Sequence, residues 1–382
     1  MIGAGVFGIT AALELARRGH DVTLLDGRGL PNPDASSSDA SKVVRLDYGA
    51  DGLYANLAAE ALTGWRAWNG RWVDELFHET GLVLLARADL RPGSFEGDSY
   101  EMLRARGHGV ERLTPRQRTD RFPAWQGAEY PAGYFNPDGG WVESGRAVAR
   151  LLDQARDAGV RIRERAPVSG LVESGSRVTG VLLANGERER SEVVVAAAGA
   201  RTPFLLPWLA DVMQATGQAV LRFQPADRQP FEGGLFPVWC ADLARSGWYG
   251  FPVDRDGLVK VANHGPGRRV SPDDPLEVDA DERERIGDFV RRTLPDLRDA
   301  PVRAERLCLY CNTFDGDFWI DHDPDRPGLV VAAGGSGHAF KFAPVLGGIV
   351  ADAVERVPNR HLGRFAWRRP GEPGARREER IR

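Results

Sequence analysis

Cysteine and long hydrophobic runs are scarce in this chain. Of its 382 residues only three are cysteines: Cys240, Cys308 and Cys311. This number is small, and odd, for a disulfide framework, so we expect the reducing environment of the cytoplasm. No apolar run reaches the ~18 residues of a transmembrane helix, and the first residues already fit a folded unit. We therefore expect neither a membrane span nor a signal peptide.

An excess of charge of one sign is also missing. The chain carries 50 Lys and Arg against 54 Asp and Glu, a formal net charge of −4, which gives no basic footprint for nucleic acid. Hydrophobic residues are abundant: they make up 42% of the chain, which is enough to fill large cores. A chain of this length predicts two domains. We expect a monomer whose partner is a small molecule.

The first 26 residues predict a dinucleotide-binding unit. Three glycines have the G-x-G-x-x-G spacing, which gives a tight turn and a close approach of backbone to pyrophosphate: Gly3, Gly5 and Gly8. Apolar residues at helical spacing follow, and an apolar strand over 22–25 ends at Asp26. A carboxylate there accepts both ribose hydroxyls and repels a 2′-phosphate, which favours FAD or NAD over NADP. The alternative is a βαβ unit that holds no nucleotide.

The strand expected before the glycine motif is very short in this sequence. Only Met1 and Ile2 precede Gly3. A central parallel strand normally holds about five residues and is hydrogen-bonded on both edges. We therefore expect the natural protein to begin several residues upstream.

Periodicity along the rest of the chain predicts helices that alternate with buried strands. The expected helices span 53–72, 144–158 with Ser144 as the N-cap, 281–294 and 344–354. The expected buried strands span 81–85, 193–198 before Gly199, and 328–333 before the glycine-rich turn 334–337. Strands of an antiparallel sheet are expected over 217–223 and 247–264, and residues 91–139 predict a loop-rich segment.

The predicted fold class is α/β with an added antiparallel sheet, in which a Rossmann-like FAD-binding domain is interleaved with a substrate domain. The FAD-binding domain would comprise residues 1–80, 141–214 and 315–360, and the substrate domain residues 81–140 and 215–314. Residues 361–382, which are rich in arginine, predict a disordered tail.

Several separate motifs, in the same order, resemble one family of flavoproteins. They are Asp39-x-x-Lys42-x-x-Arg45, Trp248-Tyr-Gly-Phe-Pro252, Leu258-Val-Lys-Val-Ala-Asn-His264, the run from Leu307 to Asp321, and Gly334-Gly-Ser-Gly-His-Ala-Phe-Lys-Phe342. Together with the opening glycines they resemble the sarcosine oxidase and fructosyl-amino-acid oxidase branch of the D-amino-acid-oxidase superfamily. The similarity covers nearly the whole chain. It implies FAD as the cofactor, an amine as the substrate and O2 as the co-substrate.

The resemblance gives Cys308 the role of the cysteine that forms a thioether with the 8-methyl group of the flavin, a bond that needs a thiolate. The alternative is that Cys308 is only a buried strand residue. Cys311 lies three residues further on, on the opposite face of a strand, and would not replace it. No second cysteine pair or histidine cluster completes a metal site, so we expect no metal.

The resemblance also implies residues that bind FAD around its ring: Lys42, Gly199, Gly334 and Gly337. The turn that contains the last two leads into a helix, whose first amides would face the flavin. The sarcosine oxidases have arginine at the position of Lys42, and this difference speaks against sarcosine itself as the substrate.

Five residues are implied to act on the substrate or on oxygen. Arg45 and Lys341 resemble a pair that clamps a substrate carboxylate, although either one alone is more often a surface cation. Lys260 matches a lysine near flavin N5 that promotes electron transfer to O2. Its alternative is a strand cation that faces solvent. Tyr249 and His264 match positions that line the pocket, and their alternative is a structural role.

These residues predict an FAD-dependent oxidase of a secondary amine of an amino acid, with an N-methyl, cyclic or N-fructosyl substituent. A hydride from the α C–H bond would pass to flavin N5, the imine would hydrolyse, and O2 would be reduced to H2O2. Two alternatives stay open. One is a dehydrogenase that passes its electrons to a carrier, and the other is a non-catalytic flavin-binding partner subunit.

Overall fold

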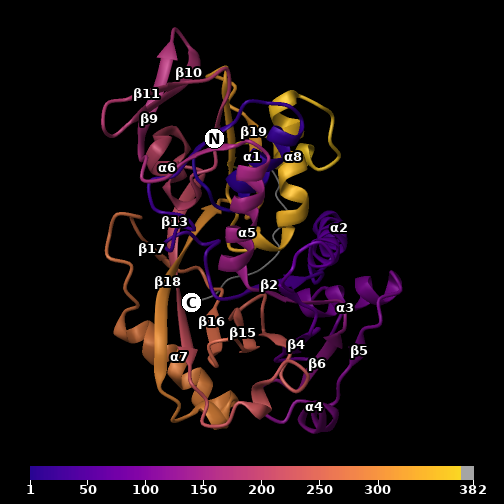
Figure 1. Ribbon diagram of the computed structural model, residues 1–382. Coiled ribbons are helices and arrows are strands. Elements are labelled where there is room, and N and C mark those ends of the chain that lie inside the picture. Colours follow the sequence, from indigo (N-terminus) through magenta and orange to yellow (C-terminus); the bar gives the residue numbers. More distant parts are fainter. Residues whose placement is uncertain (371–382) are drawn as a thin grey trace.

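The protein is described here by a computed structural model that covers residues 1–370. Several helices and sheets of short strands occupy one end of the molecule, and the longest strands form a large sheet at the other end (Figure 1). Among the short strands are β9 (Val168–Ser174), β10 (Arg177–Leu183) and β11 (Arg188–Arg190). Most of the predicted disordered tail, residues 371–382, lies outside the described residues.

A mainly parallel sheet carries the dinucleotide unit. Ile2 forms parallel bridges with Leu25 and with Ala196, so the residues just before Gly3 lie inside the sheet. The order is β8, β1, Ile2, β12, β20 and β19, and β19 runs antiparallel to its neighbour. The strands are β1 (Thr23–Leu25), β8 (Arg161–Arg163), β12 (Val194–Ala196), β19 (Trp319–His322) and β20 (Leu329–Ala333).

Glycine allows close packing around the first helix. α1 (Val6–Arg17) packs against both α5 (Ser144–Asp157) and α8 (Ala343–Glu355). A Cβ on Gly347 of α8 would lie 2.4 Å from the carbonyl oxygen of Thr10 in α1, so the two helices meet backbone to backbone. A Cβ on Gly8 would lie only 1.8 Å from the oxygen of Gly3, which explains the third glycine of the motif.

Nine strands from two separate stretches of the chain form the second sheet. Their order is β17, β13, β16, β15, β14, β4, β6 and β5, with β18 paired to β13. The strands are β4 (Leu82–Ala86), β5 (Glu111–Arg112), β6 (Ala132–Asn136), β13 (Met213–Phe223), β14 (Val238–Ala241), β15 (Trp248–Val253), β16 (Val259–Asn263), β17 (Arg268–Arg269) and β18 (Val302–Thr313). β14 and β4 run parallel, and the other pairs are antiparallel. The predicted fold class is confirmed, while the division into domains stays a prediction.

A large aromatic core lies under this sheet. α7 (Ala280–Thr293) packs against β13 and β16. Its Phe289 stacks on Trp239 of β14 and on Trp248 of β15, with ring centroids 5.7 and 4.2 Å apart. Phe289 therefore packs on the face of β15 opposite Tyr249, the residue after Trp248.

A separate three-stranded sheet contains the strand that carries Lys42 and Arg45. β2 (Lys42–Arg45) pairs with β7 (Gly139–Val142), which also pairs with β3 (Phe77–His78). Next to it lies α2 (Gly52–Asn69) (Figure 1). The remaining elements are α6 (Thr202–Leu205), α9 (Leu362–Phe365) and the 3-10 helices η1 (Gly199–Arg201), η2 (Pro207–Leu209), η3 (Gln229–Phe231), η4 (Pro295–Leu297) and η5 (Phe340–Phe342).

The segment 91–139 is not loop-rich as expected. It contains α3 (Phe95–Ala105), α4 (Pro115–Arg121) and the strands β5 and β6. Local capping explains the two helices: the Ser94 side chain accepts from the amide of Gly97, and Thr114 forms a capping box with Gln117. The abundance of proline, glycine and charge concealed these short elements.

Two further expectations need correction. Ser144 is the first residue of α5 and Glu143 is its N-cap; the Ser144 hydroxyl bonds the backbone of Asp39 instead. Residues 361–370, expected to be disordered, fold onto the molecule, where Phe365 is fully buried and Arg368 pairs with Asp315 at 2.6 Å.

Residues 1–370 contain neither a candidate membrane span nor a candidate metal cluster. Along this part of the chain no helix is long and apolar enough to cross a bilayer. The same residues contain no group of three His, Cys, Asp or Glu side chains placed to hold a metal ion.

Candidate active site

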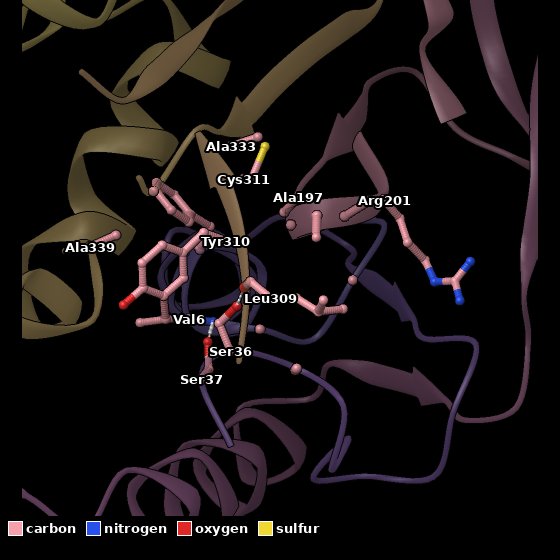
Figure 2. Close-up of a pocket in the computed structure, with 18 of the residues that line it drawn as sticks. Val6, Ser36, Ser37, Ala197, Arg201, Leu309, Tyr310, Cys311, Ala333 and Ala339 are labelled. Carbon is pink, nitrogen blue, oxygen red and sulfur yellow. Dashed lines mark hydrogen bonds between the residues drawn. The ribbon is translucent and has the colours of Figure 1, made fainter. Parts of the chain in front are cut away.

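A cleft opens where the parallel sheet meets the large sheet (Figure 2). The start of α1, the segment after Asp26, the residues after β12, the end of β18 and the turn after β20 form its walls. Seven of the predicted cofactor residues line it: Gly3, Gly5, Asp26, Lys42, Gly199, Gly334 and Gly337. The other two, Gly8 and Cys308, do not line it, and Cys308 is fully buried.

The start of α1 is shaped for an anionic group. Gly3 has φ +93°, and a Cβ there would lie 2.5 Å from the oxygen of Ala197. Gly5 is the N-cap of the helix and has no side-chain cap of its own. The nearest atom to a Cβ at Gly5 would be the Ser37 hydroxyl, 3.5 Å away. The Ser37 hydroxyl accepts the amide of Val6 at 2.9 Å. Gly3, Gly5 and Val6 line the cleft at this helix N-terminus, where the helix dipole favours a phosphate.

The carboxylate of Asp26 is fixed at the edge of the same cleft. Its Oδ2 accepts the amide of Ala4 at 2.9 Å, and its Oδ1 accepts the amide of Arg28 at 3.0 Å and the Asn32 side chain at 3.2 Å. A carboxylate held at the end of β1 fits a ribose diol. The glycine cradle and Asp26 thus fit the adenylate half of FAD.

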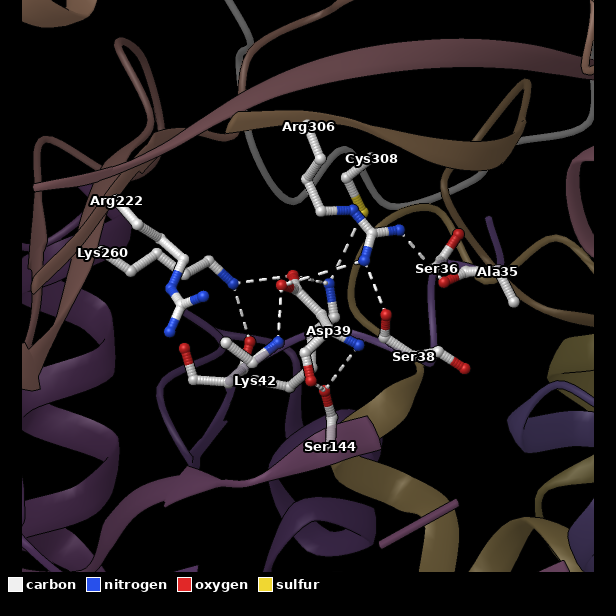
Figure 3. A network of polar contacts seen from close by, with 12 residues as sticks. Ala35, Ser36, Ser38, Asp39, Lys42, Ser144, Arg222, Lys260, Arg306 and Cys308 are labelled. Carbon is white, nitrogen blue, oxygen red and sulfur yellow. Dashed lines mark hydrogen bonds and ion pairs between the residues drawn. The ribbon is translucent and has the colours of Figure 1, made fainter. Parts of the chain in front are cut away.

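A second group of residues contacts Lys42, which itself lines the cleft. Oδ2 of Asp39 accepts from Nζ of Lys42 at 2.9 Å and from Nζ of Lys260 at 2.7 Å (Figure 3). Lys42 Nζ also lies 3.5 Å from Sγ of Cys308. The side chain of Lys260 is only 1% exposed, so the interpretation of Lys260 as a solvent-facing strand cation is wrong.

Burial and charge act against one another in this group. Burial alone would raise the pKa of Asp39, but Lys260, Lys42 and Arg306 hold it well below its ordinary value. Burial lowers the pKa of Lys260 to about 8, against the opposing effect of Asp39. For Lys42 burial acts downward as well, yet Asp39 and Cys308 raise its pKa above the ordinary value. The two lysines therefore differ in how firmly they hold a proton.

Lysine is rare in this chain. The sequence contains only three lysines, Lys42, Lys260 and Lys341. The rest of its 50 Lys and Arg residues are arginine. The side chains of Lys42 and Lys260 are 16% and 1% exposed, and Lys341 is 3% exposed. Arginine keeps its proton under all ordinary conditions, whereas a buried lysine titrates readily. All three lysine side chains of the chain are thus buried or largely buried.

The two cysteines of β18 face opposite sides of the strand. Cys308 packs with Val220, Ala262 and Tyr310, whereas Cys311 packs with the core below the parallel sheet and lines the cleft. Burial raises the pKa of the Cys311 thiol to about 12, so Cys311 is a poor nucleophile. The strand alternation predicted from the sequence is confirmed for this pair.

Arg45 and Lys341 meet on one tyrosine. Lys341 Nζ donates to the hydroxyl of Tyr48 at 2.9 Å and to the carbonyl oxygen of His338 at 2.9 Å. The guanidinium of Arg45 lies 4.8 Å from the centre of the same Tyr48 ring and donates to the carbonyl oxygen of Asp47. Both cations are 3% exposed, so neither is a surface cation.

Tyr249 and His264 lie around Tyr310. His264 Nδ1 is 3.3 Å from the Tyr310 hydroxyl, and Tyr249 is hydrogen-bonded to Tyr310 as well. Burial raises the pKa of Tyr249 well above its ordinary value, with Tyr310 and Cys308 adding to the effect. Tyr249 is therefore a neutral phenol that can donate a hydrogen bond. Tyr310 itself lines the cleft (Figure 2).

Sequence reasoning gave no role to several residues of the site: Ser37, Asp39, Tyr48, Arg306 and Tyr310. Two signals were available. Tyr310 stands two residues after Cys308, which puts both on one face of a strand. Asp39 stands in the same motif as Lys42, but whether it faces that lysine depends on the loop between them.

The fold and the cleft define a two-part flavoprotein, in which a dinucleotide cradle opens toward a second sheet. A family described as FAD dependent oxidoreductase (DAO) matches residues 1–353, and the chain belongs to this family. The predicted class, an FAD-dependent oxidoreductase, is confirmed.

Three similar proteins illustrate where the chain lies in the family. N-methyl-L-tryptophan oxidase of Salmonella heidelberg is 29% identical over 370 residues, which cover 96% of each chain. Fructosamine oxidase (Amadoriase II) of Aspergillus fumigatus has 26% identity and a TM-score of 0.82 over 96% of this chain and 88% of that one. Fructosyl peptide oxidase from E. terrenum, at 21% identity and a TM-score of 0.86 over 100% of this chain and 95% of its own, supports the fold alone. The resemblance drawn from the sequence motifs is confirmed.

Proposed function

We propose that the protein is an FAD-dependent oxidase that acts on a secondary amine of an amino acid. The relatives named N-methyl-L-tryptophan oxidase and fructosamine oxidase support an N-methyl or N-fructosyl substituent, to which we add cyclic amines. The monomeric state and the cytoplasmic location remain predictions.

The buried pair Arg45 and Lys341 is the observation that carries this proposal. Both cations contact Tyr48, and both are almost without access to water. A substrate carboxylate fits, because arginine grips it with two parallel hydrogen bonds and lysine adds a point charge. The substrate would thus be held by the carboxylate of an amino acid.

The chain also prepares the amine for oxidation. When bound, FAD supplies a hydride acceptor for the α C–H bond and delivers two electrons to O2. The amine must be neutral to give up a hydride, and the nearby charges of Arg45 and Lys260 disfavour a protonated amine. The neutral phenol of Tyr249 would donate a hydrogen bond to the substrate, and His264 would line the pocket beside it.

We also propose that FAD is attached covalently through Cys308. Its sulfur lies 3.5 Å from the ammonium of Lys42, and a thiolate is the nucleophile that such a bond requires. The pKa of Cys311, raised to about 12 by burial, speaks against the alternative cysteine.

Anaerobic titration tests the proposal. N-methyl, cyclic and N-fructosyl amino acids are added in turn to the flavin-loaded protein, and air is then readmitted. We expect one class to bleach the flavin spectrum, and air to restore the colour with formation of H2O2. If the flavin is bleached but air does not restore its colour, the protein is a dehydrogenase and not an oxidase. If none of the three classes bleaches the flavin, the protein is a non-catalytic flavin-binding subunit and the proposal is wrong.

A further inference from the structure

One carboxylate oxygen accepts from two lysines, the buried Lys260 and the partly buried Lys42, as Figure 3 shows. The distances from Oδ2 of Asp39 are 2.9 Å to Nζ of Lys42 and 2.7 Å to Nζ of Lys260. The Asp39 side chain is 2% exposed, so water contributes little to its solvation. The two ammonium groups are therefore held as neighbours with one negative charge between them.

Asp39 is itself held in place by the start of α5. The Ser144 hydroxyl donates to the carbonyl oxygen of Asp39 at 2.8 Å and accepts its amide at 3.2 Å. The amide of Gly145 donates to the same carbonyl oxygen at 2.9 Å. Three hydrogen bonds to one backbone unit fix the point from which the carboxylate extends.

Lys260 is held equally firmly on its own side. Besides the bond to Asp39, its Nζ donates to the carbonyl oxygen of Ser41 at 2.7 Å and lies 4.7 Å from the centre of the Phe251 ring. All three contacts favour the charged ammonium over the neutral amine.

The groups that face this cluster come from four strands. β2 supplies Lys42, and β15 supplies Tyr249. β18 supplies Cys308, Tyr310 and Arg306, whose guanidinium lies 3.9 Å from Asp39. On β13, Arg222 pairs in register with Lys260, but Asp254 and Asp256 bind its guanidinium. Asp39 thus sits among three cations.

We propose that Asp39 is a positioning residue for the oxygen reaction: its carboxylate fixes Lys260 beside the cofactor site and keeps it protonated at neutral pH. The inference rests on the proposed function. In that reaction O2 takes two electrons from the reduced cofactor and two protons and leaves as H2O2, and the Lys260 ammonium stabilises the negative charge that O2 acquires on the way.

The charges predict what happens without Asp39. Burial and the neighbouring Lys42 both lower the pKa of Lys260, and Asp39 opposes them. In Asp39→Asn two ammonium groups would face each other with an amide between them. Lys260, whose pKa is already low, would release its proton first and lose the charge that O2 needs.

Stopped-flow kinetics on the flavin-loaded protein test this. The flavin is reduced anaerobically by the amine and is then mixed with O2, from about pH 6 to about pH 10. For Asp39→Asn we expect the pH profile of reoxidation to move down by about two units or more, which from a Lys260 pKa of about 8 slows reoxidation at neutral pH about tenfold or more. The rate of flavin reduction should change less than about threefold.

Nuclear magnetic resonance gives a readout that needs no turnover. Since the chain has only three lysines, lysine labelled at Cε and Nζ gives three signals, which Lys42→Arg, Lys260→Arg and Lys341→Arg assign. In Asp39→Asn the Lys260 signal should titrate at a lower pH than in the unchanged protein. This experiment works on the resting protein, so it tests Asp39 even if the proposed substrate is wrong.

Two further variants separate positioning from general damage. Asp254→Asn removes a similarly buried carboxylate that pairs with Arg222 on the same sheet, and it should leave the Lys260 titration and the reoxidation profile unchanged. Ser144→Ala loosens the backbone of Asp39, so it should shift both in the same direction as Asp39→Asn but less. If Asp39→Asn does not fold, Ser144→Ala still tests the positioning role of Asp39. An unchanged Lys260 titration in the folded Asp39 or Ser144 variant would overturn the inference.

Discussion

At this site several charged side chains are buried and are stabilised by hydrogen-bond partners. Arg45, Lys260 and Lys341 are each at most 3% exposed, and each is bonded to an oxygen of the chain. Breaking such a pair is costly, since a buried charge without its partner costs about 3–5 kcal/mol. Substitutions at these positions should therefore have large and specific effects.

The first prediction at the residue scale concerns the clamp. Arg45→Ala or Lys341→Ala should raise KM for an amino acid substrate by roughly 30-fold or more, since losing one partner of a buried charge pair costs about 2–5 kcal/mol. Steady-state kinetics should also show that the same substrate without its carboxylate is affected far less. Arg104→Ala, at an exposed arginine paired with Glu101, is the matched control. An equal increase in KM for both substrates would show that Arg45 and Lys341 do not bind the carboxylate.

The second prediction concerns the flavin linkage. After acid denaturation the unchanged protein should give a yellow pellet, whereas Cys308→Ser should release its flavin to the supernatant. Cys311→Ser should keep the colour, because Cys311 lies on the opposite face of β18 and its thiol pKa is raised to about 12. A colourless pellet from the flavin-loaded unchanged protein would show that the cofactor is not covalently bound.

At the scale of elements, the position of α1 depends on its contact with α8. That contact is close because Gly347 has no side chain, and the helix N-terminus that it positions opens on the cleft. β2 and β18 have a comparable role, since they bring Lys42 and Cys308 to one point. The site is thus built from elements whose spacing is set by small residues and by sheet register.

Gly347→Ala tests this spacing. The added Cβ would lie 2.4 Å from the backbone oxygen of Thr10, so the helices must separate, and overpacking of this kind costs about 1–3 kcal/mol. Urea unfolding should show this loss, together with a lower flavin content. The neighbouring Gly348→Ala meets no atom within 4 Å and should instead stabilise the helix by up to about 1 kcal/mol. Similar stabilities for the two variants would contradict the packing argument.

At the scale of the whole molecule, the cleft joins the parallel sheet to the nine-stranded sheet. The segment 27–41, which has no helix or strand, connects the two sides. In it the Ser37 hydroxyl accepts the amide of Val6 at 2.9 Å, and the Ser36 hydroxyl donates to the carbonyl oxygen of Leu309. A cofactor in the cleft would contact both sides at once.

Cofactor loading should therefore order this segment. With Cys308→Ser stripped of flavin, added FAD should slow backbone hydrogen exchange over 27–41 and raise the melting temperature with FAD concentration, because a ligand that binds only the folded state stabilises it. Exchange in the centre of β13, which is buried on both faces, should hardly change. Mass-spectrometric exchange that is identical with and without FAD would contradict the prediction.

Much of this protein could be predicted from local sequence signals. The glycine spacing, the apolar strand and Asp26 predicted the nucleotide cradle, because a tight turn and a fixed carboxylate each depend on a few neighbouring residues. The motifs around Arg45, Cys308 and Lys341 gave the candidate site. Local capping in 91–139 was hidden among prolines and charges.

Tertiary structure alone decided which side chains meet. Strand alternation left Lys260 equally able to face solvent or core, and only the packing of β16 against the segment that carries Asp39 turned it inward. Ser144 was expected to cap a helix, yet its hydroxyl holds Asp39 from far along the chain. Secondary structure follows from short-range sterics and hydrogen bonding. The sharing of one carboxylate by two lysines also requires the segment 39–42 and β16, which are far apart in the sequence, to be packed at a fixed distance.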